Sequence, residues 1–190
     1  MEFIGDKDYW EEKYANRSDE PLSPETSLVE NIKYFKSGSV LDIACGDGRN
    51  TLFLLENDFT VTGIDYSKTA LERLKMFADR KSYSVDTKQI DLSVPDSLKE
   101  IGIFDNILVN HYKLSQEQLS MIKNCLSDHG LLFVCGFGHK HTPDSKIKKE
   151  DLIPPTDFDG IKQSFELLHY HENQDDRGFF VTYIFRKKES

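Results

Sequence analysis

The sequence lacks any long apolar run. Its longest such stretches, residues 131–134 and 179–181, are far shorter than the roughly 20 residues needed to cross a bilayer. The first nine residues include three acidic side chains and no apolar core, which excludes a secretory signal peptide of the usual kind. We therefore expect a cytoplasmic protein that does not use a membrane as a partner.

Cysteine is scarce and unpaired. Cys45, Cys125 and Cys135 are an odd number of widely spaced residues with no paired motif, which predicts buried, reduced thiols. Excess positive charge is also missing, because the formal net charge is −9. A polyanion would be repelled, and the basic clusters at residues 146–149 and 186–188 are short and read as solvated surface. We expect no nucleic-acid partner.

The 190 residues suit one domain, 1–190, with elements that alternate in type. Apolar strand patterns alternate with helix patterns from residue 39, which predicts a doubly wound α/β fold with a mostly parallel sheet and helices on both faces. Two N-terminal helices, at 6–14 and 25–35, precede the sheet within residues 1–37. The expected strands are residues 39–44, 59–64, 83–90, 104–109 and 131–137, then an antiparallel hairpin of 165–171 and 179–187 with a turn at 172–178. The expected later helices begin at 51, 67 and 115, the last ending near residues 128–130.

The most informative segment is residues 40–50, with the sequence VLDIACGDGRN. A hydrophobic strand enters a turn with Gly46 and Gly48, and a helix opens directly afterwards. Glycine permits a sharp turn and close approach of a ligand, and the first turn of a helix has free N–H groups. Ligands bind beyond the carboxyl ends of strands in open α/β sheets, so this position predicts a nucleotide-type site.

Acidic residues end three successive strands of the predicted sheet. Asp42 precedes the glycine turn, Asp65 ends the second strand and Asp91 ends the third. Asp65 is placed to accept hydrogen bonds from both ribose hydroxyls, and Asp91 from an exocyclic amine such as that of adenine. Each acid alone could be a helix cap or turn residue, but the three together favour a nucleoside site.

The residues in and around the glycine turn indicate which kind of nucleotide would bind. A dinucleotide fingerprint requires a third glycine where Thr51 stands, and the carboxylates of Asp42 and Asp47 would repel a pyrophosphate. The same charges suit a ligand with an ammonium and a sulfonium. A nicotinamide-dependent oxidoreductase is therefore the weaker alternative.

These segments, with residues 61–67 and 104–110, resemble the successive motifs of class I S-adenosylmethionine-dependent methyltransferases. The order GDGRNT at 46–51 and an opening helix with Tyr9, Trp10 and Tyr14 are similar to the tellurite-resistance and thiopurine branch. The resemblance implies S-adenosylmethionine as cofactor and the strand order 3-2-1-4-5-7-6, with the last strand antiparallel. The cofactor residues that it implies, with the opening helix included, are Trp10, Tyr14, Arg17, Asp42, Ala44, Cys45, Gly46, Gly48, Asn50, Asp65, Tyr66, Asp91, Leu92 and Asn110.

The opening helix has two interpretations. Trp10, Tyr14 and Arg17 follow one another at helical spacing and can share one face. That face could close over the active site, with Arg17 or Tyr14 near the cofactor carboxylate. Alternatively, Trp10 simply anchors a terminal helix on the core.

Catalytic residues are harder to assign. His111 and Tyr112 directly follow the fourth strand and are candidate bases, or else ordinary loop residues beside the pocket. No amino-methyltransferase motif of the Asn-Pro-Pro-Tyr type occurs there, which speaks against DNA and glutamine-amide methylation. The pairs His139/His141 and His169/His171 have no acidic or cysteine partner at recognisable spacing, so we expect no metal.

The acceptor is expected to be a small molecule, because little chain remains to hold a macromolecule. Residues 138–160 are polar and contain three prolines, so they form our candidate substrate-recognition loop. A non-catalytic cofactor-binding sensor or partner subunit is the main alternative, and the chain could be a monomer or homodimer. The acceptor atom cannot be inferred from the sequence, because fold and cofactor do not fix acceptor chemistry.

Overall fold

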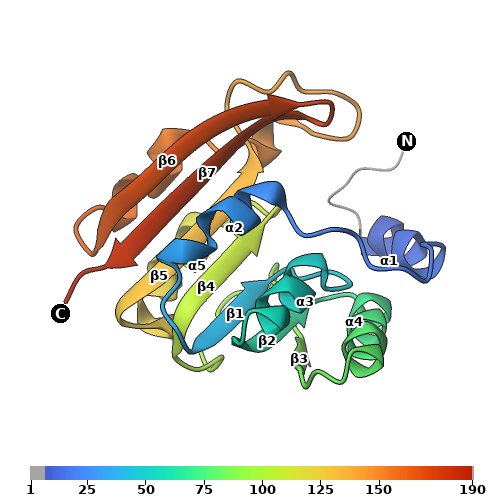
Figure 1. Ribbon diagram of the computed structural model, residues 1–190. Helices are drawn as coiled ribbons and strands as arrows, with labels where there is room; N and C mark the ends of the chain where they lie inside the picture. Colours follow the sequence, from blue (N-terminus) through green and yellow to red (C-terminus); the bar gives the residue numbers. More distant parts are fainter. Residues whose placement is uncertain (1–6, 190) are drawn as a thin grey trace.

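A computed structural model of the protein describes residues 7–189, which form a seven-stranded sheet surrounded by helices (Figure 1). The strand order is β3-β2-β1-β4-β5-β7-β6, as the resemblance implied. All neighbouring pairs from β3 to β5 are parallel, and β7 pairs antiparallel with both β5 and β6. The strands are β1 (Ser39–Ile43), β2 (Thr60–Asp65), β3 (Asp86–Gln89), β4 (Phe104–Asn110), β5 (Leu126–Phe137), β6 (Phe165–Asp175) and β7 (Gly178–Lys187).

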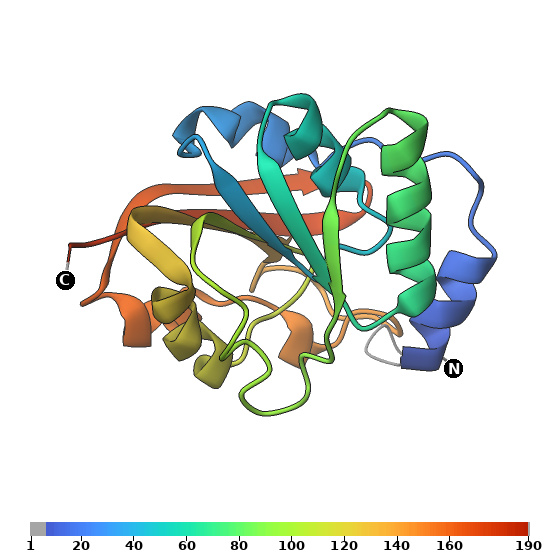
Figure 2. The ribbon, with the colours of Figure 1, turned by 90° about the horizontal axis from the view of Figure 1, so that it is seen from below.

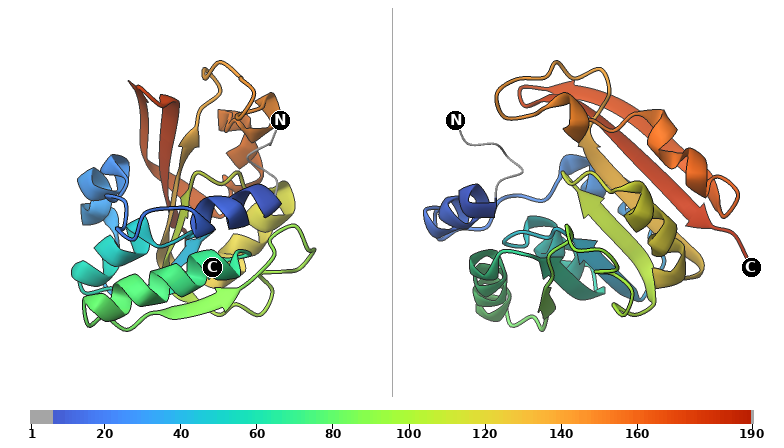
Figure 3. Two further views of the ribbon diagram at one scale, coloured as in Figure 1. Left: turned by 90° about the vertical axis from the view of Figure 1, so that its right-hand side faces the viewer. Right: turned by 180° about the vertical axis from the view of Figure 1, so that it is seen from behind.

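Helices cover both faces of the sheet (Figure 2). One apolar cluster joins one face of the strands to α2 (Thr26–Asn31), α3 (Arg49–Glu56) and α4 (Lys68–Arg80). The second joins the other face to α5 (Gln116–Cys125) and the 3-10 helix η3 (Pro155–Ile161), and α5 lies over β4 and β5 in Figure 3. The central strands β1 and β4 are buried on both faces, which explains their nearly continuous apolar sequences.

The opening helix α1 (Lys7–Ala15) lies apart from these layers, beside α4 and beyond the carboxyl ends of the strands (Figures 1 and 2). The predicted start of this helix at Asp6 lies outside the described residues. The predicted helix at 25–35 is divided between α2 and the 3-10 turn η1 (Ile32–Tyr34).

Several predicted boundaries were wrong. The hairpin turn is not residues 172–178, because β6 continues to Asp175 and pairs with Gly178, leaving only two residues in the turn. These residues are mostly polar because β6 is an edge strand, and a prediction based on polarity alone assigns them to a loop. Likewise α5 ends at Cys125 and β5 begins at Leu126, while β3 is shorter than the predicted 83–90.

The segment between β5 and β6 is more ordered than a loop. It contains η2 (Lys149–Asp151) and η3, and the Phe158 and Ile161 side chains of η3 are buried in the core. The candidate recognition loop is thus partly built into the core, and its exposed residues lie both ahead of η3 and on the outer side of η3.

No helix within residues 7–189 has the length and apolar character needed to cross a membrane.

Replacement of Ser67 tests the connection between β2 and α4. The Ser67 hydroxyl accepts a hydrogen bond from the Ala70 amide and the residue is fully buried. Ser67→Ala should lower the free energy of unfolding by about 1–2 kcal/mol, because it leaves a helix N–H without a partner. Denaturant unfolding measures this, and Ser120→Ala on the exposed face of α5 is the control. An equal effect of both changes would contradict the capping role.

Candidate active site

The glycine turn after β1 has a left-handed backbone over several residues. The φ angles of Ala44, Gly46 and Gly48 are +56°, +57° and +90°. A side chain on Gly48 would collide with Leu74, and one on Gly46 would collide with the Tyr14 hydroxyl. Glycine is therefore required at both positions by backbone angle and by space. The turn leads directly into α3, as the sequence predicted.

Asp65 joins the turn to the end of β2. Its Oδ2 accepts a hydrogen bond from the Gly46 amide at 2.9 Å, and its Oδ1 accepts one from the Ser67 amide at 2.9 Å. Each oxygen keeps a second lone pair, so the carboxylate can still accept two hydroxyl hydrogen bonds from a ribose. Burial raises the pKa of Asp65, although the Ser67 and Gly46 amides act in the opposite direction.

Asp42 is completely enclosed behind the turn. It is 1% exposed, and its Oδ2 accepts a hydrogen bond from the Thr51 hydroxyl at 2.6 Å. Burial raises the pKa of Asp42 to about 7, because the surrounding protein disfavours the charged form. Asp42 therefore supports the start of α3, and it would affect a ligand through the turn rather than by direct contact.

Asp47 is not the unpaired negative charge that the sequence suggested. This carboxylate is buried, but Arg17 binds Oδ1 at 2.7 Å and Arg73 binds Oδ2 at 3.4 Å. Its charge is largely compensated by these two guanidinium groups, and burial disfavours the charged form of Asp42. Repulsion of a pyrophosphate by these two acids is thus weaker than the sequence suggested.

The opening helix α1 and the residues after it bring Trp10, Tyr14 and Arg17 together beside the glycine turn. Trp10 stacks on Tyr14 at 5.7 Å between ring centroids, and the Arg17 guanidinium lies 4.9 Å from the Tyr14 ring. Tyr14 is the buried member and covers Gly46, whereas Trp10 is only partly buried. Tyr14 is thus the residue of this face that is packed against the turn, and both interpretations of Trp10 remain predictions.

The ends of β2 and β3 meet the start of α1. Lys7 forms an ion pair with Asp91, and its carbonyl accepts a hydrogen bond from the Tyr66 hydroxyl at 2.7 Å. The hydrogen bonds from Lys7 and Ser93 lower the pKa of Asp91 to about 2. Asp91 and Tyr66 thus both contact Lys7, and Leu92 follows Asp91 in the chain. The Asp91 carboxylate remains partly exposed.

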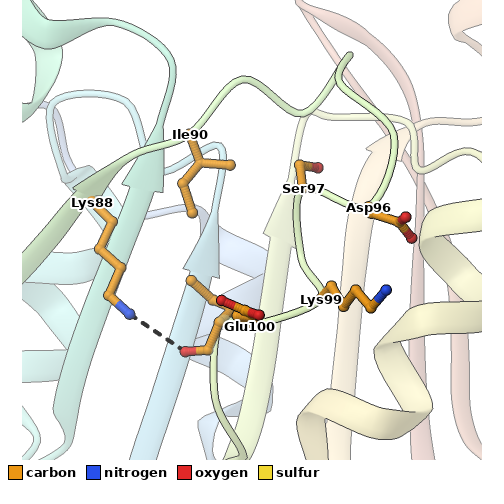
Figure 4. Close-up of a pocket in the computed structure, with 7 residues that line it drawn as sticks. Lys88, Ile90, Asp96, Ser97, Lys99 and Glu100 are labelled. Carbon is orange, nitrogen blue, oxygen red and sulfur yellow. Dashed lines mark hydrogen bonds between the residues drawn. The ribbon is translucent and has the colours of Figure 1, made fainter.

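A cavity of about 390 Å³ lies beside this group, between the segment after β3 and the segment after β4. Leu92, Leu114 and Met121 provide apolar walls, and Gln118 donates hydrogen bonds to the Leu92 carbonyl at 2.8 Å and to the Tyr112 hydroxyl at 3.2 Å. A second cavity, of about 340 Å³, lies at the β3 edge and is lined mostly by charged side chains, with Lys88 bonded to the Ile101 carbonyl (Figure 4). The first cavity is the one with apolar walls, and the second has mainly charged walls.

Two candidate residues after β4 turn to opposite faces. Tyr112 packs against the core on the α5 side, and burial raises the pKa of its hydroxyl. His111 has a left-handed backbone (φ +55°), and its ring contacts the Phe137 and Phe180 rings on the other side. The structure therefore does not bring the two candidate bases together, and the role of each stays a prediction.

The side chains of Asn110 and Asn50 also have different hydrogen-bonding surroundings. The Asn110 side-chain oxygen is buried at the carboxyl end of β4, beside the end of β1, and finds no hydrogen-bond partner among residues 7–189. Asn50 instead accepts a hydrogen bond from the Glu25 amide at 2.9 Å and is buried, so it supports the start of α2. Asn110 is thus the one of the pair that is free to bind a cationic or amine ligand.

Sequence reasoning missed a charged cluster beside His111. Glu25, at the start of α2, is 4% exposed and binds His111 at 2.8 Å and Arg177 at 2.8 and 3.1 Å, with Arg49 at 3.5 Å. Burial alone would raise the pKa of Glu25, but the hydrogen bonds from His111 and Arg177 hold it well below its usual range. These residues are up to 152 positions apart, and only the short β6–β7 turn brings Arg177 to the carboxyl edge.

Comparison with known proteins identifies the family. Residues 2–136 match the family described as "Tellurite resistance protein TehB". The chain belongs to the TehB family. A probable S-adenosyl-L-methionine-dependent methyltransferase TehB of Haemophilus influenzae is 22% identical, over 96% of this chain and 67% of its own length. The putative methyltransferase YqeM of Bacillus subtilis is 32% identical, over 77% of this chain and 61% of its own length.

Solved structures agree on the fold. TehB from Haemophilus influenzae matches with a TM-score of 0.69 and 20% identity, covering 96% of this chain and 67% of that one. Coclaurine N-methyltransferase, solved with N-methylheliamine and SAH, matches with a TM-score of 0.65 and 16% identity, covering 85% and 71%. The TehB-family chain is an S-adenosylmethionine-dependent methyltransferase by its family, which also decides against the oxidoreductase alternative.

The histidine pairs have other contacts in the structure. His169 and His171 stack on each other along β6, with Tyr34 against His169, and His141 accepts a hydrogen bond from the Phe179 amide. Among the residues that the structure describes, no three or more histidine, cysteine or acidic side chains are grouped to hold a metal ion. The three cysteines are free and buried, as predicted.

The pKa of Asp42 predicts a pH dependence of stability. Between its ordinary pKa near 4 and the raised value of about 7, the folded protein binds more protons than the unfolded chain, so stability falls as pH rises through this window. Asp42→Asn keeps an oxygen for Thr51 and removes the ionisation. The variant should gain stability relative to the parent between pH 5 and pH 8 in denaturant unfolding, whereas Asp86→Asn on the exposed edge should not. A constant difference between parent and Asp42→Asn would show that Asp42 ionises freely.

Proposed function

We propose that this TehB-family protein transfers the methyl group of S-adenosylmethionine to a small-molecule acceptor at the carboxyl edge of β4 and β5. The observation that carries the proposal is the buried, unpartnered Asn110 oxygen beside the glycine turn and Asp65. A buried polar atom without a partner is costly unless a ligand satisfies it. A ligand that presents an amine there and ribose hydroxyls to Asp65 has the chemistry of this cofactor.

The described residues fit the cofactor in three groups. Asp65 would bind the ribose, and Asn110 with the turn around Gly46 would bind the methionyl end. Tyr66, Asp91 and Leu92 would surround the adenine at the mouth of the 390 Å³ cavity. When bound, the cofactor supplies a methyl group on a sulfonium, and much of the acceleration then comes from holding the acceptor in line with it.

The Arg17 and Lys7 side chains connect cofactor binding to α1. Both residues pair with acids at the strand ends, Arg17 with Asp47 and Lys7 with Asp91. Asp91 Oδ2 keeps a second lone pair beside Lys7, so the adenine amine would share this oxygen with Lys7 and lie next to the start of α1. Tyr14 would keep covering the turn.

A small acceptor is supported by the charge and the shape of the acceptor side. The region over His111 is bounded by Phe137, Phe180 and the β6–β7 turn with Arg177. The net charge of −9 opposes binding of nucleic acid. The family description suggests tellurite as one acceptor to try.

A cofactor-binding sensor without turnover remains the second candidate, since it would need the same Asp65 and Asn110. A turnover measurement distinguishes a methyltransferase from a non-catalytic sensor. Labelled S-adenosylmethionine, offered with tellurite, an aliphatic thiol, a catechol and an aromatic amine, should give a methylated product for an enzyme and none for a sensor.

Asp65 provides the direct binding test. Asp65→Ala removes an acceptor for two ribose hydroxyls, each bond to a charged group contributing about 1.5–3 kcal/mol, so the affinity for S-adenosylhomocysteine should fall at least about tenfold. Isothermal titration measures the affinity, with NAD as the control ligand and Asp86→Ala as the matched surface variant. Unchanged affinity in folded Asp65→Ala would contradict the ribose assignment, and no binding by the parent would contradict the proposed function.

A further inference from the structure

The histidine beside the proposed methyl-transfer position is held in one orientation by a buried carboxylate. His111 Nε2 lies 2.8 Å from Glu25 Oε2. The Glu25 pKa is held well below its usual range, so this side chain is ionised at neutral pH and can only accept a hydrogen bond. The proton of the neutral imidazole therefore lies on Nε2, which leaves the lone pair on Nδ1.

Glu25 is itself immobilised. Arg177 binds both carboxylate oxygens, at 2.8 and 3.1 Å, and Arg177 is in turn held by Asp175 at 2.6 Å and lies 4.8 Å from the Phe180 ring. The Glu25 amide bonds to Asn50, so backbone and side chain are both fixed. Buried charges in proteins are normally paired. The ion pairs of Glu25 with Arg177 and Arg49 would be enough for that purpose without His111. The third contact, with His111, requires its own explanation.

The surroundings of His111 suit proton transfer. Its amide donates to the Cys135 carbonyl at 2.8 Å, and the rings of Phe180 and Phe137 lie 5.3 and 5.7 Å from its own. The side chain keeps 27% of its surface exposed, and within residues 7–189 no hydrogen-bond partner occupies Nδ1. The charged or titratable groups around the ring are Glu25, Arg49, Asp175 and Arg177, with Cys135 and His141 on the β5 side.

We propose that Glu25 is a positioning residue that presents His111 Nδ1 as the proton acceptor, and that the methyl acceptor is a protic nucleophile: a thiol, a hydroxyl compound or an amine. This inference rests on the proposed function. It names the substrate class, because an oxyanion that attacks with a free lone pair has no proton to lose and needs no base.

The step balances without another reactant. The acceptor's proton moves to His111 Nδ1. A thiol or hydroxyl group attacks the methyl carbon with the electron pair that its departing proton leaves behind, whereas an amine attacks with its lone pair and recovers one from the broken N–H bond. The bond between that carbon and the sulfonium sulfur breaks, and its electron pair stays on sulfur. The imidazolium is stabilised by Glu25 and afterwards releases its proton to water.

The change Glu25→Gln gives a sharp test of orientation. Arg177 makes its shorter contact, 2.8 Å, with Oε1, so the amide oxygen should keep that place. The amide NH₂ should then take the Oε2 place facing His111, with loss of the longer contacts of Arg177 and Arg49 to Oε2. His111 Nε2 would then become the acceptor and Nδ1 would carry the proton, the wrong tautomer for a base. In serine proteases the corresponding Asp→Asn change has this effect and lowers kcat about 10⁴-fold.

Nitrogen NMR of the histidine rings measures the tautomer without any acceptor. In the full chain labelled at histidine, at pH 8, the His111 signals are those lost in His111→Gln. We expect a proton on Nε2 in the parent and in the control Glu172→Gln, whose carboxylate pairs with Lys140 on the same hairpin. We expect it on Nδ1 in Glu25→Gln. A parent with the proton on Nδ1, or an unchanged tautomer in a folded Glu25→Gln, would overturn the proposal.

Turnover provides the second readout, with the probe acceptors named above. With a protic probe, Glu25→Gln and His111→Gln should lower kcat at least about 100-fold, with the Kd of S-adenosylhomocysteine within twofold of the parent.

The outcomes separate the two proposals. Turnover of tellurite alone, at equal rates in the parent and Glu25→Gln, would overturn this inference and leave the methyltransferase function standing. Absence of cofactor binding by the parent would overturn the proposed function itself. If no probe reacts, the NMR result decides the positioning role of Glu25.

Discussion

The hydrogen bonds that Asp65 accepts from the Gly46 and Ser67 amides hold the site together. They tie the turn after β1 to the end of β2 and to the start of α4, three segments that meet only because parallel strands place their carboxyl ends at one edge. Gly46 can donate this bond only with a left-handed backbone, and Tyr14 can cover the turn only because Gly46 has no side chain. The position of α1 therefore depends on the same few atoms that would hold the ribose.

The acceptor side depends on a different constraint, the satisfaction of a buried charge. Glu25 lies directly before α2. It contacts Arg49 at the start of α3, His111 after β4 and Arg177 in the β6–β7 turn. An unpaired carboxylate in that place would be strongly destabilising. The contacts that close the acceptor side of the sheet are thus required by folding, and the proton-accepting orientation of His111 is obtained from the same arrangement.

Much of this architecture could be predicted from the sequence, because it is encoded in local patterns. Alternating strand and helix periodicity, the glycine turn and Asp65 gave the parallel sheet and its binding edge, and family resemblance gave the strand order. The turn between β6 and β7 could not be predicted, because Glu172–Asp175 belongs to an edge strand whose polar residues look like a loop. The Glu25 cluster was missed for a related reason: its members are ordinary charged residues whose relation exists only after the chain has folded. The charge of the glycine turn was also misjudged, since the compensation of Asp47 by Arg17 and Arg73 is a tertiary contact.

The central claim is that S-adenosylmethionine binds across the carboxyl ends of β1, β2 and β4, and a crystal structure of the complex with S-adenosylhomocysteine tests it most directly. We expect ribose hydroxyls on the Asp65 carboxylate, the amino-acid end beside Asn110, and adenine next to Leu92 and Asp91. A nucleoside bound elsewhere, with the Asn110 oxygen still lacking a partner, would contradict it.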